Sequence, residues 1–387
     1  MYSLMETFYY SLFNVLNGIK YPYFWLMIFI VFIQYYKIGK KEKDILGINK
    51  RSPLLNTFQS ILYGLLAGIL GSSIFIYLRV IIDSRDFLFI LPLALILSMI
   101  HPRFVCFSYS GGIVSLFSLL FGWPKVNVTG FMFVVGVLHL VESILVLLDG
   151  TRTRVPILME KEGAVVGGFS MNSFWPVPFI IFVNRGIPYP ILLFAILGYG
   201  DFTFSNFPKK KARESASLLF TFSIILIILS VLSIYYNLFK YIAAIFSPLA
   251  HEIIIALGKY REKGKADLLT RPIEGLKILD VLPNTVGEKM GLSTGDIILS
   301  INGKRILDKR DLDDIIYYKP NTITAKIFSI KKGITIKEFI SKNMGIDNLG
   351  IIVIPNEAED TFIVEEPRYK IFKLLNKFNE RRLTFKN

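Results

Sequence analysis

Long apolar runs separated by short polar segments fill the first two thirds of the chain. Each run is long enough, or nearly so, to cross the hydrocarbon core of a bilayer as a helix. The runs are Tyr21–Tyr36, Thr57–Leu78, Phe87–Ile100, Phe104–Phe121, Val128–Leu148, Ser215–Leu238 and Phe239–Leu257. The pattern predicts a polytopic transmembrane domain over residues 1–258 with about 7–9 spans.

Residues 150–198 interrupt this helical pattern. Val155–Met159 and Ala164–Phe169 are short strand-like runs around a turn, which predicts a small hairpin at the membrane face. The apolar residues 175–198 contain several prolines and are divided into pieces too short to cross, so we expect a re-entrant pair shielded by protein.

The last third of the chain changes to short alternating runs and turn residues. Strands are predicted at Leu276–Leu282 and Ile297–Ile301, the second followed by Asn302-Gly303, a type I′ hairpin signal. Lys309–Tyr318 carries apolar residues at helical spacing. Thr322–Ile330 and Ile334–Phe339 alternate around a turn and predict a hairpin, and a further strand is expected at Leu349–Ile354.

Several of these turn residues recur in a known order around the two strands. Glu274-Gly275-Leu276, Gly291-Leu292, Gly295-Asp296-Ile297-Ile298 and Ile301-Asn302-Gly303 resemble a PDZ domain of the bacterial type. The predicted fold class is therefore an α-helical polytopic membrane domain followed by a small α+β PDZ domain. We assign residues 259–272 to a basic linker, 273–355 to the PDZ domain and 356–387 to a basic amphipathic tail. Two interpretations of the tail are open: it contacts membrane lipids, or it packs as a helix on the PDZ domain.

The PDZ resemblance implies a groove in which a peptide of a partner protein adds a strand beside a helix. On this interpretation Glu274 and Gly275 form the loop that receives the peptide. Leu276 and Ile278 on the strand, with Leu312 and Ile315 on the helix, line the pocket.

Charge gives the orientation. The formal net charge is +14, and basic residues are concentrated in loops that flank apolar runs. That arrangement is typical of membrane topology rather than of nucleic-acid binding, so we expect no nucleic acid as a partner. We therefore expect a multi-pass protein of the cell membrane. Counting alternate crossings predicts that its PDZ domain and C-terminus are cytoplasmic.

Four ionisable residues stand inside predicted spans: His139, Glu142, His251 and Glu252. Such groups are costly in a bilayer and have structural or functional roles. His251-Glu252 resembles the start of the zinc helix of site-2 proteases, and Leu148-Asp149-Gly150 resembles their third-ligand motif. The second zinc histidine, however, is replaced by Ile255.

The residues therefore predict a protein that is not an enzyme, with no catalytic residue, no metal and no cofactor. The chain holds one cysteine, so a cysteine metal cluster is not possible. An intramembrane metalloprotease and a transporter stay open as alternatives, because the four ionisable residues could meet at the membrane midplane.

The spacing of Gly64 and Gly68 allows another helix to approach closely. Two interpretations are open at this point. The glycines form a homo-oligomer seam, or they pack against other parts of the same bundle.

Three segments carry a second resemblance. His139–Glu142, the region from Gly167-Gly168-Phe169 to Phe174–Pro178, and Ser247–Glu252 are similar to the polytopic PDZ proteins that act as topological determinants in the Gram-positive Min division system. The resemblance implies a membrane-anchored scaffold that binds other proteins through its PDZ groove and positions the cell-division machinery.

Overall fold

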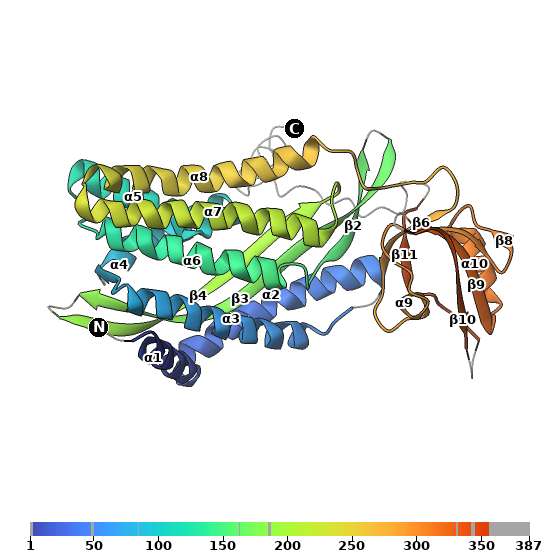
Figure 1. Ribbon diagram of the computed structural model, residues 1–387, viewed down its shortest axis with the longest axis horizontal. Coiled ribbons are helices and arrows are strands. Elements are labelled where there is room, and N and C mark those ends of the chain that lie inside the picture. The colour runs from blue at the N-terminus through green and yellow to red at the C-terminus, as the bar shows by residue number, and fades with distance from the viewer. Residues whose placement is uncertain are drawn as a thin grey trace, which may run out of the picture.

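The computed structural model describes residues 3–47, 50–83, 85–161, 163–184, 187–329, 332–341 and 345–355. The tail predicted at residues 356–387 lies outside the described residues. The chain forms a helical region around a long β-hairpin, and a small α+β domain lies at one end of it (Figure 1).

The helices predicted from the apolar runs are present, and one further helix precedes them. They are α1 (Leu4–Asn17), α2 (Pro22–Leu46), α3 (Pro53–Tyr77), α4 (Asp86–Ile100), α5 (Phe107–Phe121), α6 (Val128–Asp149), α7 (Pro208–Tyr235) and α8 (Leu238–Lys263). Within the described part of the chain, α2, α3, α6, α7 and α8 are long and apolar enough to cross a membrane, and α4 and α5 are shorter apolar helices. This confirms the helical polytopic fold class.

The centre of the helical region is extended rather than helical. β2 (Val155–Lys161) and β3 (Ala164–Asn184) form the small hairpin predicted from the sequence, but β3 continues far beyond it. β3 then pairs along its length with β4 (Pro188–Thr203), so residues 175–198 are two strands of a hairpin. At about 3.3 Å per residue, either strand is long enough to cross a bilayer.

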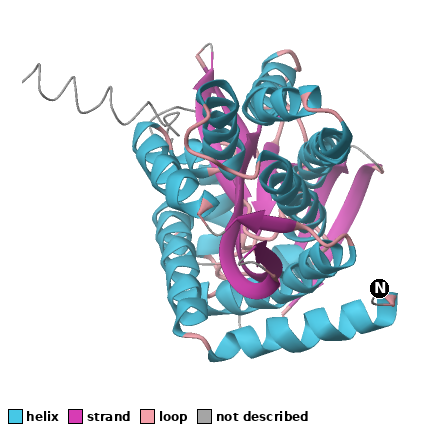
Figure 2. Ribbon diagram, turned by 90° about the vertical axis from the view of Figure 1, so that its left-hand side faces the viewer, coloured by secondary structure: helices cyan, strands magenta, loops and turns pink. Residues whose placement is uncertain are grey.

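Short strands complete this sheet. β1 (Ile81–Asp83) pairs with the end of β3 in parallel, and β5 (Leu269–Thr270) pairs with its beginning. Helices lie on both sides of the strands when the molecule is viewed along its long axis, and α1 lies across the others (Figure 2). The largest buried side chain of this core is Trp175 in β3.

Among the described strands, none pairs with one edge of β3 between β2 and β1, and this edge faces the helices. Because backbone groups alternate along a strand, every second residue points to this edge. These residues are Asn172, Phe174, Pro176, Pro178 and Ile180. The hydroxyl of Tyr35 in α2 accepts from the Phe174 N–H and donates to the Phe174 carbonyl, both at 3.0 Å.

Ser72 in α3 provides the partner for another N–H on this edge. Its Oγ accepts a hydrogen bond from the Ile180 N–H at 2.9 Å. Between these two positions stand Pro176 and Pro178, which have no N–H to satisfy. At these positions no N–H donor is left without a partner, and only carbonyl groups remain along the unpaired edge. An unpaired strand edge is therefore tolerable in an apolar bundle.

Gly64 and Gly68 of α3 lie directly against this edge. A Cβ on Gly64 would be 2.0 Å from the Pro176 carbonyl oxygen, and one on Gly68 would be 2.0 Å from that of Pro178. The helix backbone therefore touches the strand, with Cα–H groups facing carbonyl oxygens. The glycine face is occupied by the chain's own hairpin, so the predicted homo-oligomer seam at this face is wrong.

Substituting alanine for Gly64 or Gly68 should destabilise the membrane region by about 1–3 kcal/mol or more, because helix and strand must separate. Thermal unfolding of the detergent-purified protein measures this. Gly71→Ala in the same helix is the matched control, since its Cβ would meet only Val141 at 3.6 Å. Equal unfolding temperatures for the three variants would contradict the close packing.

The C-terminal domain contains the elements predicted for it, together with one short helix and one short strand. They are β6 (Leu276–Val281), α9 (Val286–Lys289), β7 (Ile297–Ile301), β8 (Lys304–Arg305), α10 (Lys309–Tyr317), β9 (Thr322–Ser329), β10 (Gly333–Ile340) and β11 (Ile351–Val353). The main strand order is β10-β9-β7-β6-β11. Asn302 and Gly303 both have positive φ, 49° and 80°, as the type I′ signal requires.

The segment predicted as a basic linker has defined structure. α8 continues to Lys263, and Glu262 near its end accepts hydrogen bonds from the backbone N–H groups of Phe204 and Ser205, just after β4. β5 then joins the sheet of the membrane region. The chain thus enters the C-terminal domain along the base of the hairpin.

Candidate functional site

The candidate peptide-binding site depends on which strand lies at the sheet edge. β6 pairs with β7 on one side and with β11 on the other, so it is an inner strand. β11 pairs with β6 alone among the described strands. The edge predicted at Leu276 and Ile278 is therefore wrong, and β11 is the edge strand on this side of the sheet.

Burial of the predicted groove residues agrees with this correction. Leu276, Ile278 and Leu312 are 1%, 0% and 6% exposed and belong to one apolar core, and Ile315 is partly buried against it. These side chains fill the domain interior instead of lining an open pocket. A charge at Leu312 would accordingly test folding and not binding.

The predicted peptide-receiving loop lies on the far side of β6. Gly275 has φ +84° and packs on the carbonyl of Ile298 in β7. Glu274 is exposed and forms an ion pair with Arg305 at 2.8 Å. The structure therefore does not bring Glu274 and Gly275 to the open edge.

The open edge has its own loop. Residues 345–350 form this loop, and its start lies beside the C-terminal end of α10. There the Ile346 N–H donates to the Pro320 carbonyl at 2.9 Å. Gly350 turns the chain into β11 with φ +68°, a conformation that favours glycine. Ile346, Leu349 and Val353 pack into the same core as Leu312, so α10 and β11 share one wall.

Alternation along β11 identifies the free backbone groups. The Leu282 N–H donates to the Gly350 carbonyl, and the Ile354 N–H donates to the Lys277 carbonyl. Residues 350 and 354 thus face β6, and Ile351 directs its N–H and carbonyl to the open edge. The sequence signal for this site is Leu349-Gly350-Ile351-Ile352, a glycine framed by apolar residues directly before a strand.

The helix beside this edge has a well-defined start. Asp308 caps α10 by accepting from the Asp311 N–H at 3.0 Å, and Asp311 accepts from the Leu307 N–H at 2.8 Å. Hydrogen bonds from the backbone N–H groups of Leu307 and Asp308 hold the pKa of Asp311 below its ordinary value. Asp311 is therefore charged at neutral pH, and its reciprocal hydrogen bonds with Asp308 fix the register of the helix.

The C-terminal domain is docked on the base of the membrane hairpin. Val165 and Phe169 of β3 form one apolar cluster with Leu279 of β6 and Ile354 after β11. Gly167 permits this approach, because a Cβ there would be 2.7 Å from a Leu279 methyl group. β3 of the membrane region thus covers the face of the C-terminal domain's sheet that points away from that domain's own core.

Asp280 adds an ionic link at the same junction. Its side chain is 2% exposed and pairs with Lys50, which precedes α3, and with Arg154, which follows α6, the latter at 3.6 Å. Two loops of the membrane region therefore hold one carboxylate of β6. The apolar and ionic contacts together fix the domain beside the helix ends.

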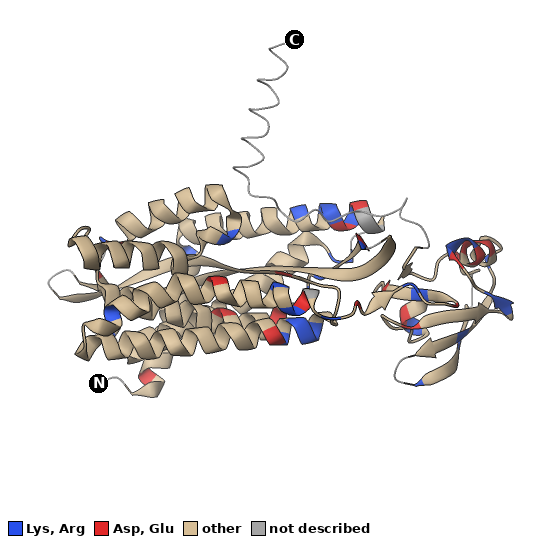
Figure 3. Cartoon of the chain, turned by 90° about the horizontal axis from the view of Figure 1, so that it is seen from above, with Lys and Arg blue, Asp and Glu red and all other residues tan. Residues whose placement is uncertain are grey.

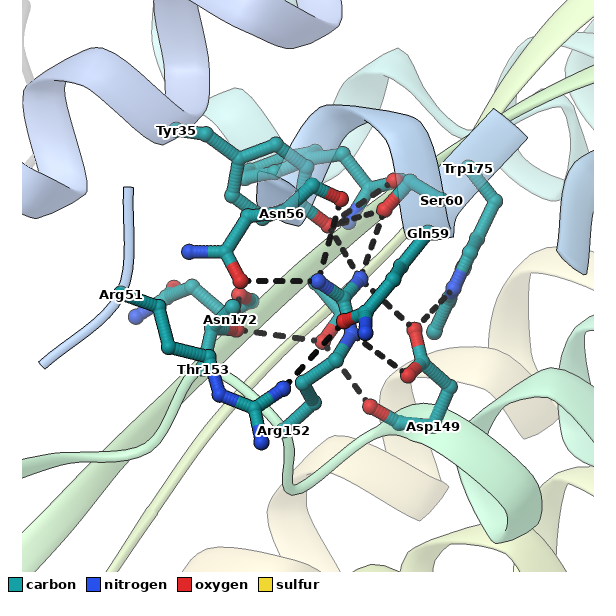
Figure 4. Close-up of polar contacts among 12 residues, drawn as sticks. Tyr35, Arg51, Asn56, Gln59, Ser60, Asp149, Arg152, Thr153, Asn172 and Trp175 are labelled. Atoms are coloured by element: carbon teal, nitrogen blue, oxygen red, sulfur yellow. Dashed lines mark hydrogen bonds and ion pairs between the residues drawn. The ribbon is translucent and has the colours of Figure 1, made fainter. Parts of the chain in front are cut away.

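A second buried network lies where α6 ends (Figure 4). Asp149 accepts two hydrogen bonds from Arg152, at 2.7 and 2.9 Å, and one from the Trp175 indole N–H at 2.8 Å. Arg152 also donates to Asn56 and Ser60 of α3. Both carboxylate oxygens are thus committed to structure, and Asp149 is not placed as the third metal ligand that its Leu148-Asp149-Gly150 setting suggested.

Asp149→Asn should lower the free energy of unfolding by about 3–5 kcal/mol, because it leaves the Arg152 guanidinium buried without its counter-charge. Glu274→Gln is the contrasting variant, since it breaks an exposed ion pair worth about 0–1 kcal/mol. Unfolding of the two purified variants would be compared with that of the parent protein. If Asp149→Asn unfolds no more easily than Glu274→Gln, the network does not lock these helices.

The four intramembrane ionisable residues are brought to one region. The rings of His139 in α6 and His251 in α8 are 5.3 Å apart. Glu252 forms an ion pair with Arg103 at 3.0 Å and accepts from the Tyr109 hydroxyl at 2.9 Å. The sequence did not indicate Cys106, whose Sγ lies 3.2 Å from His139 Nε2, because it is far from both histidines along the chain.

The fold and this site define a polytopic membrane protein that carries a PDZ domain. The family model for the PDZ domain matches residues 277–324, which confirms the predicted domain. The chain is also similar to the cell division topological determinant MinJ of Bacillus subtilis, with 19% identity over 227 residues. The match covers 54% of this chain and 57% of that relative, so the chain spans about half of the curated relative's length.

Proposed function

We propose that the chain is a membrane-anchored adaptor whose PDZ domain takes up an extended peptide segment of a partner protein along β11. The open edge of β11 beside α10 carries this proposal. Added strands pair through backbone hydrogen bonds, and side-chain pockets next to the helix supply specificity. The docked position holds the groove at a fixed place relative to the membrane region.

The similarity to MinJ supports a role in cell division for this adaptor. On this proposal the partners are proteins of the division site. The chain recruits them to the membrane and does not catalyse a reaction. A fluorescent fusion of the chain should concentrate where the cell divides. Even distribution over the membrane would contradict this part of the proposal and leave peptide binding untouched.

The charge distribution supports a cytoplasmic PDZ domain. Lys and Arg residues gather at the helix ends next to the C-terminal domain (Figure 3). They include residues of the α2 end, the α7 start and the α8 end. Positively charged loops stay on the cytoplasmic side during insertion, so we expect the domain beside them on that side.

A cysteine at Tyr317, exposed on α10, should resist an impermeant thiol reagent in intact cells. A cysteine at Ile187, exposed at the opposite tip of the hairpin, should react. The parent chain measures any background from Cys106, and permeabilised cells should label both positions. Labelling of the Tyr317 position alone in intact cells would reverse the orientation.

Ile351→Pro should weaken peptide binding about tenfold, because it removes the outward N–H and the strand pairing that depends on it. The bonds from β11 to β6 use the neighbouring residues and remain. Peptides tiled from the membrane and division proteins of the cell would be selected on the full-length protein. The best binder would then be titrated by fluorescence polarisation.

Ile336→Pro is the matched control for this titration. Its N–H also points away from the sheet, at the opposite edge on β10, since the Ser341 N–H faces β9. We expect this variant to bind like the parent. Equal affinities for both proline variants and the parent would exclude β11 as the binding edge.

A further inference from the structure

Three side chains with metal-binding atoms meet inside the helical region. Cys106 comes from the start of α5, His139 from α6 and His251 from α8, and their ligand atoms all lie within 4.8 Å of one another. Cys106 Sγ and His139 Nε2 lie 3.2 Å apart. Three separate elements therefore contribute to one small cluster.

The outer hydrogen bonds fix which nitrogen of each ring faces the cluster. His139 Nδ1 lies 2.7 Å from the Val135 carbonyl oxygen. A carbonyl can only accept, so Nδ1 carries the proton and, in the neutral ring, Nε2 presents a lone pair toward Cys106. A backbone carbonyl in this position is the usual outer partner of a metal-binding histidine.

His251 is held in the same way through a short relay. The Tyr109 hydroxyl donates to Glu252 at 2.9 Å, so its oxygen accepts from His251 Nδ1 at 3.0 Å. Arg103 in turn holds Glu252 through its ion pair. His251 Nε2 is thus the ring nitrogen left for the cluster, and Glu252 acts as an orienting group instead of a catalytic base.

One acceptor in this cluster has no hydrogen-bond donor or cation as a partner. With both rings neutral, the cluster contains two unprotonated ring nitrogens and one thiol, and the thiol proton can satisfy only one of the two nitrogens. A metal ion satisfies both nitrogens and the sulfur together. Tetrahedral zinc bonds of about 2.3 Å to sulfur and 2.0 Å to nitrogen place these atoms about 3.5 Å apart, close to the observed Cys106–His139 separation.

Charge and surroundings also fit a divalent ion. Glu142 lies one helical turn after His139 and interacts electrostatically with Cys106, His139 and His251. A thiolate and one carboxylate would neutralise a divalent cation, which lowers the cost of charge in an apolar region. Phe222 packs edge-on against both histidine rings, with its ring centroid 5.0 Å from that of His139 and 5.9 Å from that of His251, and so covers one side of the cluster.

We propose that Cys106, His139 and His251 bind a transition-metal ion, with Zn²⁺ favoured by this sulfur and nitrogen donor set. The fourth position is open to Glu142 or to an external ligand. The ion joins the start of α5 to α6 and α8, the helices that pack around this point.

Cobalt titration of the full-length protein in detergent tests the site. After chelator treatment, one equivalent of Co²⁺ should give a thiolate charge-transfer band, and Zn²⁺ should displace it. Cys106→Ser, His139→Gln and His251→Gln should each lose the band. His101→Gln is the matched control, because His101 is the remaining histidine of three and lies outside the cluster.

Two measurements on the parent protein decide the question even if a variant fails to fold. X-ray absorption of the zinc-loaded protein should show one sulfur and two imidazole ligands, and Zn²⁺ should raise the thermal unfolding temperature. Absence of stoichiometric binding by the folded parent, or a zinc shell without sulfur, would overturn the proposal. Retention of the cobalt band in Cys106→Ser would overturn it equally.

Discussion

The structure depends on how the helices satisfy the free edge of β3. An unpaired strand edge inside an apolar bundle would leave several backbone N–H groups without partners, each at a cost of several kcal/mol. Here two prolines remove donors, and the hydroxyls of Tyr35 and Ser72 accept from two others. The glycines of α3 then let the helix backbone cover the remaining carbonyls. Strand and helix are therefore matched residue by residue along this contact.

The same hairpin connects the membrane region to the PDZ domain. Its middle is buried among helices, and its beginning carries β2, β5 and the apolar cluster that receives β6 and the residue after β11. Because Asp280 is also held by Lys50 and Arg154, movement of the domain would expose a buried carboxylate and two cations. The peptide edge of β11 is thus carried on a support that extends through the helical bundle.

Buried charges in this protein are neutralised locally. Asp149 is paired with Arg152, and Asp280 with Lys50 and Arg154. The network around Arg152 joins α2, α3, α6 and β3: the guanidinium bonds to the three helices, and Asp149 links it to Trp175 of β3. Such pairs add little net stability compared with apolar packing, but breaking one leaves a charge with no partner, and this favours a single arrangement.

The sequence by itself determined the helices of the membrane region, the PDZ domain and nearly every strand within that domain. Long apolar runs and turn signals such as Asn302-Gly303 are local properties, and local geometry follows from them. Strand order, the partner of the Gly64 face, the extended form of residues 175–198 and the meeting of Cys106 with two histidines were decided by the tertiary structure. A strand buried on both faces has the same apolar pattern as a short helix, and an inner strand alternates like an edge strand. Contacts between residues far apart in the chain leave no local pattern, because their energy arises only when the elements are packed together.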